Sequence, residues 1–170
     1  MIRTLLIATF ALATIGCSAT NLNRDSDDFI ARAYIETDTA TVWRHMVEPE
    51  SLTQWFSAPC REFGPQVGDP IHFADDERSY YAGKIVALEE GRKLDYTFAF
   101  VDFGFDEDTL VEVDLFERGS TVLVEIRHDC THAPETANII TPVGWTKSLS
   151  RLKTLLESGA AMEWPVEPEA

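Results

Sequence analysis

Apolar residues alternate with other residues along positions 29–35, in the first regular segment of the chain. A period of two residues is typical of a β-strand that buries one face. The positions that would share the buried face are Phe29, Ala31, Ala33 and Ile35. The pattern therefore predicts that the folded part of the chain begins with a strand.

The apolar period lengthens after Asp38, a residue type that often caps the start of a helix. The helical face that follows would carry Val42, Trp43, Met46 and Val47. Pro49 suits the first turn of a second short helix, because proline lacks an amide proton that this position does not need. The second helix would bury Leu52, Trp55 and Phe56.

Turn-forming residues divide the middle of the chain into short segments, as at Gly64-Pro65, Gly68-Asp69-Pro70 and Gly91. The expected strands lie near residues 60–63, 71–74, 79–89, 93–101, 109–117 and 121–128. Their inward sets would be Leu94, Tyr96, Phe98 and Phe100; Val111, Val113 and Leu115; and Val122, Val124, Ile126 and His128. Turns this closely spaced are typical of an antiparallel meander.

A long amphipathic helix is expected at the end, with Thr141 as its cap, Pro142 in its first turn and Gly159 as its stop. Its apolar face would carry Trp145, Leu149, Leu152 and Leu156. We therefore expect an α+β fold: a curved antiparallel sheet of about six to seven strands around one long C-terminal helix, with two short helices after the first strand. Residues 29–159 would form this domain, and residues 160–170 a tail whose Met162 and Trp164 could dock onto it.

The first 19 residues have the features of a targeting segment, with Arg3 followed by an apolar stretch over residues 5–15. The residues Thr14-Ile15-Gly16-Cys17 resemble a bacterial lipobox, although leucine is usual where Thr14 stands. Acylation of Cys17 would give a lipid-anchored protein of the periplasm or outer membrane. Cleavage after Ala19 would instead give a freely soluble exported protein. Residues 20–28 would then form a polar tether.

Composition limits the kinds of partner. The chain has 170 residues, which is close to one domain, and 45% of them are hydrophobic, as expected of a globular core. Its formal net charge of -15 repels phosphate backbones, so no nucleic-acid partner is expected. Membrane association would depend on the acyl anchor alone.

Dispersed features over about 130 residues, from Phe29 to Glu157, resemble one known family. They are Val42-Trp43 with Val47-Glu48-Pro49-Glu50-Ser51-Leu52 and Trp55-Phe56-Ser57; Gly83-Lys84-Ile85-Val86 with Arg92-Lys93-Leu94; and Ile126-Arg127-His128 with Gly144-Trp145, Leu149, Leu152 and Leu155. This set is similar to the activator of heat-shock-protein-90 ATPase homologue-like family, within the START-like or SRPBCC superfamily. The resemblance implies a helix-grip fold. It implies little about activity, because members of the superfamily share a cavity and not a chemistry.

The densest group of reactive side chains is His128-Asp129-Cys130-Thr131-His132. A strand continuing to residue 132 would align His128, Cys130 and His132 as zinc ligands, but the strand is expected to end near 128, so no metal is predicted. His128 would then bond within the core or offer a polar anchor to a ligand. Cys60 and Cys130 could pair, since exported proteins retain disulfides.

No arrangement of catalytic residues stands out, so enzymatic activity is left open, and no cofactor is expected. Our first hypothesis is that an apolar small molecule or lipid binds in a pocket of about 300 to 1,000 Å³ between sheet and helix. The expected lining is Trp55, Phe56, Phe98, Phe100, His128, Trp145 and Leu149. The alternative is an interaction module with a filled core, whose exposed patch near Phe103 and Phe105 binds an unknown protein. The loop 101–108 that carries these two phenylalanines is either a lid over the pocket or a solvated hairpin loop.

Overall fold

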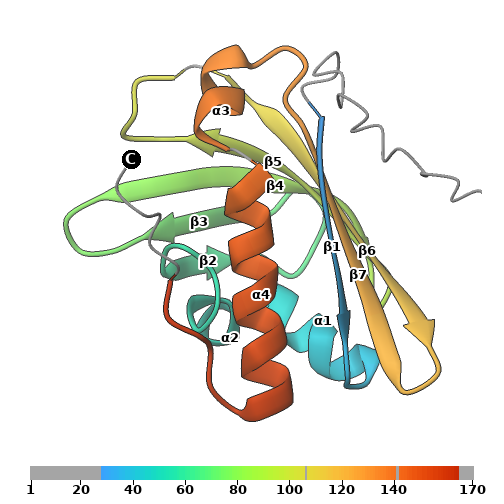
Figure 1. Cartoon of the computed structure of the whole chain (residues 1–170). Helices are drawn as coiled ribbons and strands as arrows, with labels where there is room; N and C mark the ends of the chain where they lie inside the picture. Colours follow the sequence, from blue (N-terminus) through green and yellow to red (C-terminus); the bar gives the residue numbers. More distant parts are fainter. Residues whose placement is uncertain (1–27, 106, 141, 165–170) are drawn as a thin grey trace, which may run out of the picture.

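The computed structural model describes residues 28–105, 107–140 and 142–164. In this part of the chain seven strands form one antiparallel sheet, in the order β1-β7-β6-β5-β4-β3-β2 (Figure 1). The strands are β1 (Asp28–Ile35), β2 (Cys60–Phe63), β3 (Pro70–Ala74), β4 (Ser79–Glu89), β5 (Lys93–Phe100), β6 (Thr109–Arg118) and β7 (Thr121–Asp129). The helices are α1 (Thr39–Val47), α2 (Pro49–Thr53), α3 (Pro134–Ile139) and α4 (Pro142–Ser158). The α+β class and the strand-by-strand meander are as predicted.

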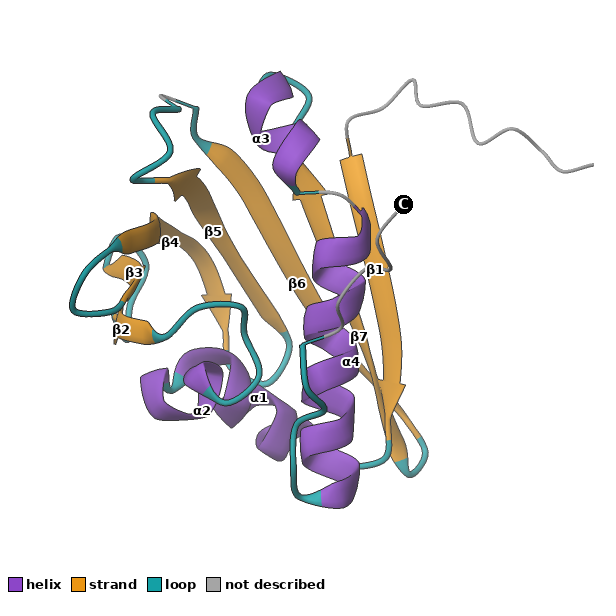
Figure 2. Ribbon diagram, turned by 60° about the vertical axis from the view of Figure 1, so that its left-hand side comes forward, coloured by secondary structure: helices purple, strands orange, loops and turns teal. Residues whose placement is uncertain are grey.

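Helix α4 lies across one face of the sheet, with α1 and α2 at one end of it and α3 at the other (Figures 1 and 2). Along β5 and β7 the apolar residues at every second position are buried under this face, because successive side chains of a strand point to opposite sides. The other face of the sheet carries no helix in the described part of the chain. The sheet and α4 therefore enclose a single layer of core side chains.

Local signals in the sequence account for the helix boundaries. The Asp38 carboxylate accepts hydrogen bonds from the backbone N and Oγ1 of Thr41, at 2.8 and 2.9 Å, and so caps α1 as predicted. Pro49 occupies the first turn of α2. Gly159 has φ +82°, a conformation that suits glycine, and it follows the last residue of α4.

Two features near the helices differ from the prediction. Helix α2 ends at Thr53, so Trp55 and Phe56 lie in the turns that follow it, although both are buried. A further helix, α3, was not predicted. It begins at Pro134, has 6 residues, and lacks both a side-chain cap and a basic residue in its last turn. Short helices of this kind carry little periodicity for a sequence pattern to reveal. Thr141, the predicted cap of α4, lies outside the described residues, as do Cys17 and the segment 1–27.

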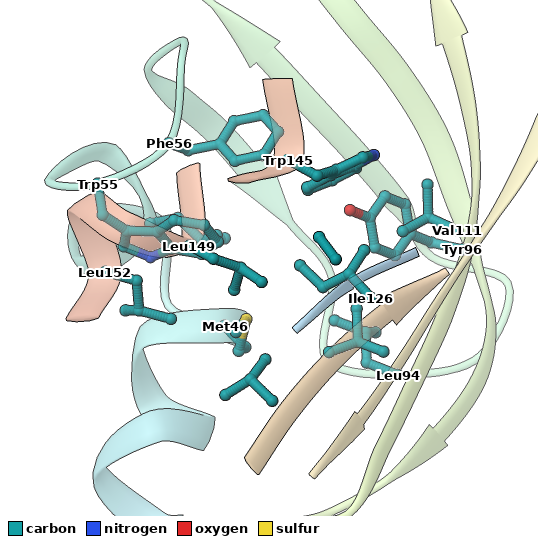
Figure 3. Close-up of a cluster of buried hydrophobic side chains, with 14 of the residues drawn as sticks. Met46, Trp55, Phe56, Leu94, Tyr96, Val111, Ile126, Trp145, Leu149 and Leu152 are labelled. Carbon is teal, nitrogen blue, oxygen red and sulfur yellow. The ribbon is translucent and has the colours of Figure 1, made fainter. Parts of the chain in front are cut away.

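The core lies between α4 and the sheet, and α1 and α2 close one end of it (Figure 3). Trp145, Leu149 and Leu152 of α4 are all at least 95% buried, which confirms the predicted apolar face of that helix. Opposite them lie the inward residues of the sheet, which include Leu94, Tyr96, Val111 and Ile126. No helix in the described part of the chain is both long enough and apolar enough to cross a membrane.

The chain turns back after α4 and runs alongside it (Figures 1 and 2). The Met162 amide donates a 2.9 Å hydrogen bond to Thr154 Oγ1, and the Arg151 guanidinium donates to the Met162 carbonyl. The Arg151 Cζ also lies 5.8 Å from the centre of the Trp164 ring, at the range of a cation–π contact. The first residues of the expected tail are thus docked, as the sequence allowed.

Candidate functional site

An open pocket of about 170 Å³ lies where α4 begins. Four parts of the chain besides α4 supply its walls: the turn after α2, strands β4 and β5, the end of α3, and the C-terminal segment. The lining residues are Phe56, Ser57, Tyr81, Phe98, Phe100, Ile139, Ile140, Gly144, Trp145, Ser148 and Trp164. Aromatic rings dominate this lining, and none of its side chains carries a charge.

The aromatic rings of the pocket hold one another in place. Phe56 lies 5.7 Å from Trp145 and 5.9 Å from Tyr81, between ring centres, and Tyr81 lies 4.9 Å from Phe98. Pairs at these separations gain stability beyond their buried area. The pocket is therefore shaped by packed rings without needing a ligand to arrange them.

His128 supports the pocket from behind, in the layer below its wall. The Trp145 Nε1–H donates to His128 Nδ1 at 3.0 Å, and His128 Nε2 lies 2.6 Å from Thr109 Oγ1. The Thr109 hydroxyl donates its only proton to the Phe98 carbonyl at 2.8 Å, so it must accept from an Nε2–H. These bonds assign His128 as a neutral imidazole that carries its proton on Nε2. Both of its ring nitrogens and the Thr109 hydroxyl then have a hydrogen-bond partner.

Burial keeps His128 neutral. Its side chain is completely buried, and the desolvation of the charged form lowers its pKa from 6.5 to about 4, although the Asp129 carboxylate acts in the opposite direction. Of the two roles considered from the sequence, the hydrogen bonds give His128 the core role: both ring nitrogens are occupied by Trp145 and Thr109. It orients Trp145 and does not itself line the pocket.

Besides His128, six residues were predicted to line a pocket, and they divide into two groups. Phe56, Phe98, Phe100 and Trp145 do line it. Trp55 and Leu149 are 98% buried in the core, and the Trp55 indole N–H bonds the His45 carbonyl at 2.9 Å. Neither of these two residues belongs to the lining of this pocket.

The sequence did not indicate the remaining lining residues. Tyr81 was one aromatic residue among many, Ile139 and Ile140 lie at the end of an unpredicted helix, and Trp164 comes from the tail. Ser148 was the detectable one, because it is a polar residue next to Leu149 on the apolar side of a predicted helix.

The large hollow expected between the sheet and α4 is not found among the described residues. The gap there is about 10 Å³, which is at the lower limit for one water molecule. Its walls include Met46 of α1, Trp55 of the turn after α2 and Tyr96 of β5, and these large side chains fill the space (Figure 3). The pocket at the start of α4 is therefore smaller than the predicted 300 to 1,000 Å³, although it too lies between the sheet and that helix.

The pairing of Cys60 with Cys130 is not found, and both are buried thiols that form no disulfide. Four strands of the sheet lie between β2, which begins at Cys60, and β7, which ends just before Cys130. At about 4.8 Å per strand the two lie roughly 24 Å apart across the sheet, far beyond the reach of a disulfide. Burial raises the pKa of the Cys60 thiol to about 11.

Within the described residues, no three or more histidine, cysteine, aspartate or glutamate side chains are grouped as metal ligands. Strand β7 ends at Asp129, so the alignment that a zinc trio would need does not extend to His132. His132 instead lines a separate surface hollow beside Thr97 and Asp108.

The loop after β5 lies next to the pocket wall. Phe100 lies 4.9 Å from Phe103 and 6.0 Å from Phe105, between ring centres. Phe105 packs against the core, whereas Phe103 remains 40% exposed. The loop is thus anchored on Phe100 and presents one aromatic side chain to solvent.

Comparison with known proteins shows which family and which solved structures the chain is similar to. Residues 36–157 match the family model described as Activator of Hsp90 ATPase homolog 1-like protein. Among curated proteins, none matches the chain.

Solved structures share the fold at low sequence identity. CalU16 from Micromonospora echinospora is 23% identical, with a TM-score of 0.61 over 78% of this chain and 77% of that one. The Aha1 dimer from Colwellia psychrerythraea is 19% identical, with a TM-score of 0.65 over 78% and 97% of the two chains. DynU16, from the dynemicin biosynthetic locus, is 17% identical, with a TM-score of 0.70 over 82% and 51%. These likenesses confirm the helix-grip fold.

Proposed function

The chain belongs to the Activator of Hsp90 ATPase homolog 1-like family, and from this premise we propose that it binds a small hydrophobic molecule in the pocket where α4 begins. The observation that carries the proposal is the lining itself, which contains six aromatic side chains and none that is charged. An open, mostly apolar recess with a few polar groups is the usual form of a small-molecule site. The fold, which is that of START-like domains, is consistent with such binding.

The size of the pocket limits what can enter it. A cavity of about 150 Å³ lined by apolar side chains is large enough for benzene. At about 170 Å³ this pocket holds one aromatic ring, or one end of a longer molecule that extends through the open side. A whole phospholipid does not fit.

The proposal is tested by titrating the purified domain with toluene and following the chemical shifts of the indole N–H groups of Trp145 and Trp164. We expect saturable changes at Trp145. Gly144→Leu should abolish them, because position 144 faces the pocket and a Cβ built there meets nothing within 4 Å. Ser150→Leu on the same helix serves as the control, since Ser150 lies outside the pocket lining. Wild-type protein without saturable changes would contradict the proposal.

We further propose that the domain is exported and held at the envelope by an acyl chain on Cys17. The support is the sequence alone: the apolar stretch after Arg3 and the lipobox-like residues that end at Cys17. Mass spectrometry of the intact mature protein tests this. A diacylglyceryl mass on an N-terminal Cys17 is expected, and an unmodified chain beginning at Thr20 would contradict the anchor and leave export in place.

A second candidate function is docking of another protein, with no ligand. The observations that favour it are the filled core and several apolar side chains that are 37–42% exposed: Val101, Phe103, Met162 and Trp164. Crosslinking in cells distinguishes the two functions. A single stoichiometric partner that is lost with Phe103→Ser and kept with Gly144→Leu would favour docking over ligand binding.

A further inference from the structure

We infer that the ligand of this pocket is a neutral compound whose single aromatic ring carries a hydroxyl or carbonyl oxygen, and that this oxygen bonds the Ser148 hydroxyl. The inference deepens the proposed function and rests on it. Three independent features support it: the state of the Ser148 side chain, the space beside Gly144, and the distribution of charge around the pocket.

Ser148 has a hydroxyl that opens on the pocket and makes no hydrogen bond to a described residue. The residue is 97% buried and lines the pocket. Elsewhere on α4 the hydroxyls of Ser150 and Ser158 bond the carbonyl one turn back, at 2.7 and 2.6 Å. No described residue bonds the Ser148 hydroxyl in this way or in any other. The buried side-chain atoms without a partner in the described residues are Asp95 Oδ1 and Thr136 Oγ1, so the Ser148 oxygen is reached from the pocket. A ligand oxygen there can replace the water that would otherwise bond this hydroxyl.

The other hydroxyls of the pocket are in a different state. Ser57 Oγ and the Tyr81 hydroxyl lie 3.3 Å apart and bond each other, and Ser57 is exposed to water. Neither therefore depends on a ligand for a partner. The buried end of the pocket, at Ser148, is where a polar group of a ligand gains most.

Gly144 leaves room beside that hydroxyl. It precedes Ser148 by four residues on α4, so both lie on the same face of the helix. A Cβ built at Gly144 meets nothing within 4 Å, so alanine would fit there. Glycine within a helix costs about 0.5 to 1 kcal/mol relative to alanine. Glycine at position 144 therefore lowers the stability of the helix, but it leaves the pocket wider beside the Ser148 hydroxyl.

Charge around the pocket favours a neutral ligand. The lining offers an anion no positive side chain, and the protein as a whole, with a net charge of -15, would repel it. Aromatic rings attract cations, but the Arg151 guanidinium already lies over the Trp164 ring and would repel a second positive charge. An uncharged ring with one oxygen meets neither obstacle.

The test compares 4-methylphenol with toluene, two compounds of one shape that differ by a hydroxyl. The dissociation constants of both are measured by chemical-shift titration on wild-type protein, on Ser148→Ala and on Ser150→Ala. Loss of one net hydrogen bond predicts that Ser148→Ala lowers the preference for 4-methylphenol over toluene by about tenfold. Ser150→Ala, whose hydroxyl bonds the helix backbone, should leave the preference unchanged.

The outcomes separate this inference from the proposed function. If both compounds bind and Ser148→Ala does not change their relative affinity, the inference is wrong and the hydrophobic pocket stands. If neither compound binds wild-type protein, the proposed function fails as well. Benzoate and tetramethylammonium test the charge argument, because tighter binding of either ion than of 4-methylphenol would overturn the neutrality of the ligand.

Discussion

Acidification should destabilise the domain through His128. The folded protein holds this imidazole neutral, with a pKa of about 4, whereas in the unfolded chain it has its ordinary value of 6.5. Between these two pH values the unfolded state binds more protons than the folded state, so the free energy of unfolding falls as the pH falls. Well above pH 6.5 the imidazole is neutral in both states and has no effect.

The size of the effect follows from the two pKa values. Lowering the pH from 7 to 5 removes about 2 kcal/mol of stability through this group, and the loss levels off at about 3 kcal/mol below pH 4. The structural reason is that a proton added at Nδ1 would face the Trp145 N–H, which already donates to that atom. Both groups would then be donors in a buried site.

The measurement is urea unfolding at pH 7 and pH 5 on wild-type protein and on His128→Gln. Glutamine offers an acceptor to Trp145 and a donor to Thr109 but does not titrate. The loss of stability between the two pH values should be about 2 kcal/mol smaller in the variant, since the exposed carboxylates act equally in both proteins. Equal losses would refute the reasoning. So would an NMR titration of the His128 ring with a midpoint near 6.5, a readout that does not depend on how the variant folds.

Three further results are expected. Gly144→Ala should raise the free energy of unfolding by about 0.5 to 1 kcal/mol, measured with urea, because it removes a helical glycine without a clash; a destabilised variant would contradict the open space beside it. Arg151→Ala should release the C-terminal segment, seen as faster hydrogen exchange of the Met162 amide, and should lower global stability by about 1 to 3 kcal/mol, because the guanidinium also donates to the Trp55 and Gln54 carbonyls; unchanged exchange would show that the segment is held by other contacts. Cys60, with its pKa near 11 and its burial, should not react with iodoacetamide at pH 8 in the folded protein but should react in urea, and rapid labelling of the native protein would contradict its position.

The sequence was a good guide to the fold because the elements of this chain follow local rules. Asp38 caps a helix through its own side chain, Gly159 supplies a left-handed stop, and alternation along β5 reports which face is buried. Each of these signals acts over a few residues, so no knowledge of the distant chain is needed to read it. Helix α3 was missed because so short a helix carries no such signal.

The site was harder to predict because it depends on distances between segments. Phe56 and Phe98 were expected in a pocket and line one, yet Trp55 and Leu149, of similar character, are core residues. Whether an aromatic side chain fills a cavity or borders it depends on how closely the helices approach the sheet, which no pattern of polarity reports. Trp164 reaches the pocket because the tail segment contacts Arg151, and from the sequence its docking onto the domain was only one possibility.

The strand order has a consequence for how the chain acquires its structure. Strands β2 to β7 each pair with a neighbour in sequence, but β1 pairs with β7, so Ile35 must find Val122. Contacts across so much intervening chain close slowly, because the entropy of the loop is lost before the pairing is gained. Strand β1 is therefore synthesised well before its partner β7 and pairs late, and until residues 121–129 are available it is an unpaired strand that chaperones or other chains can capture.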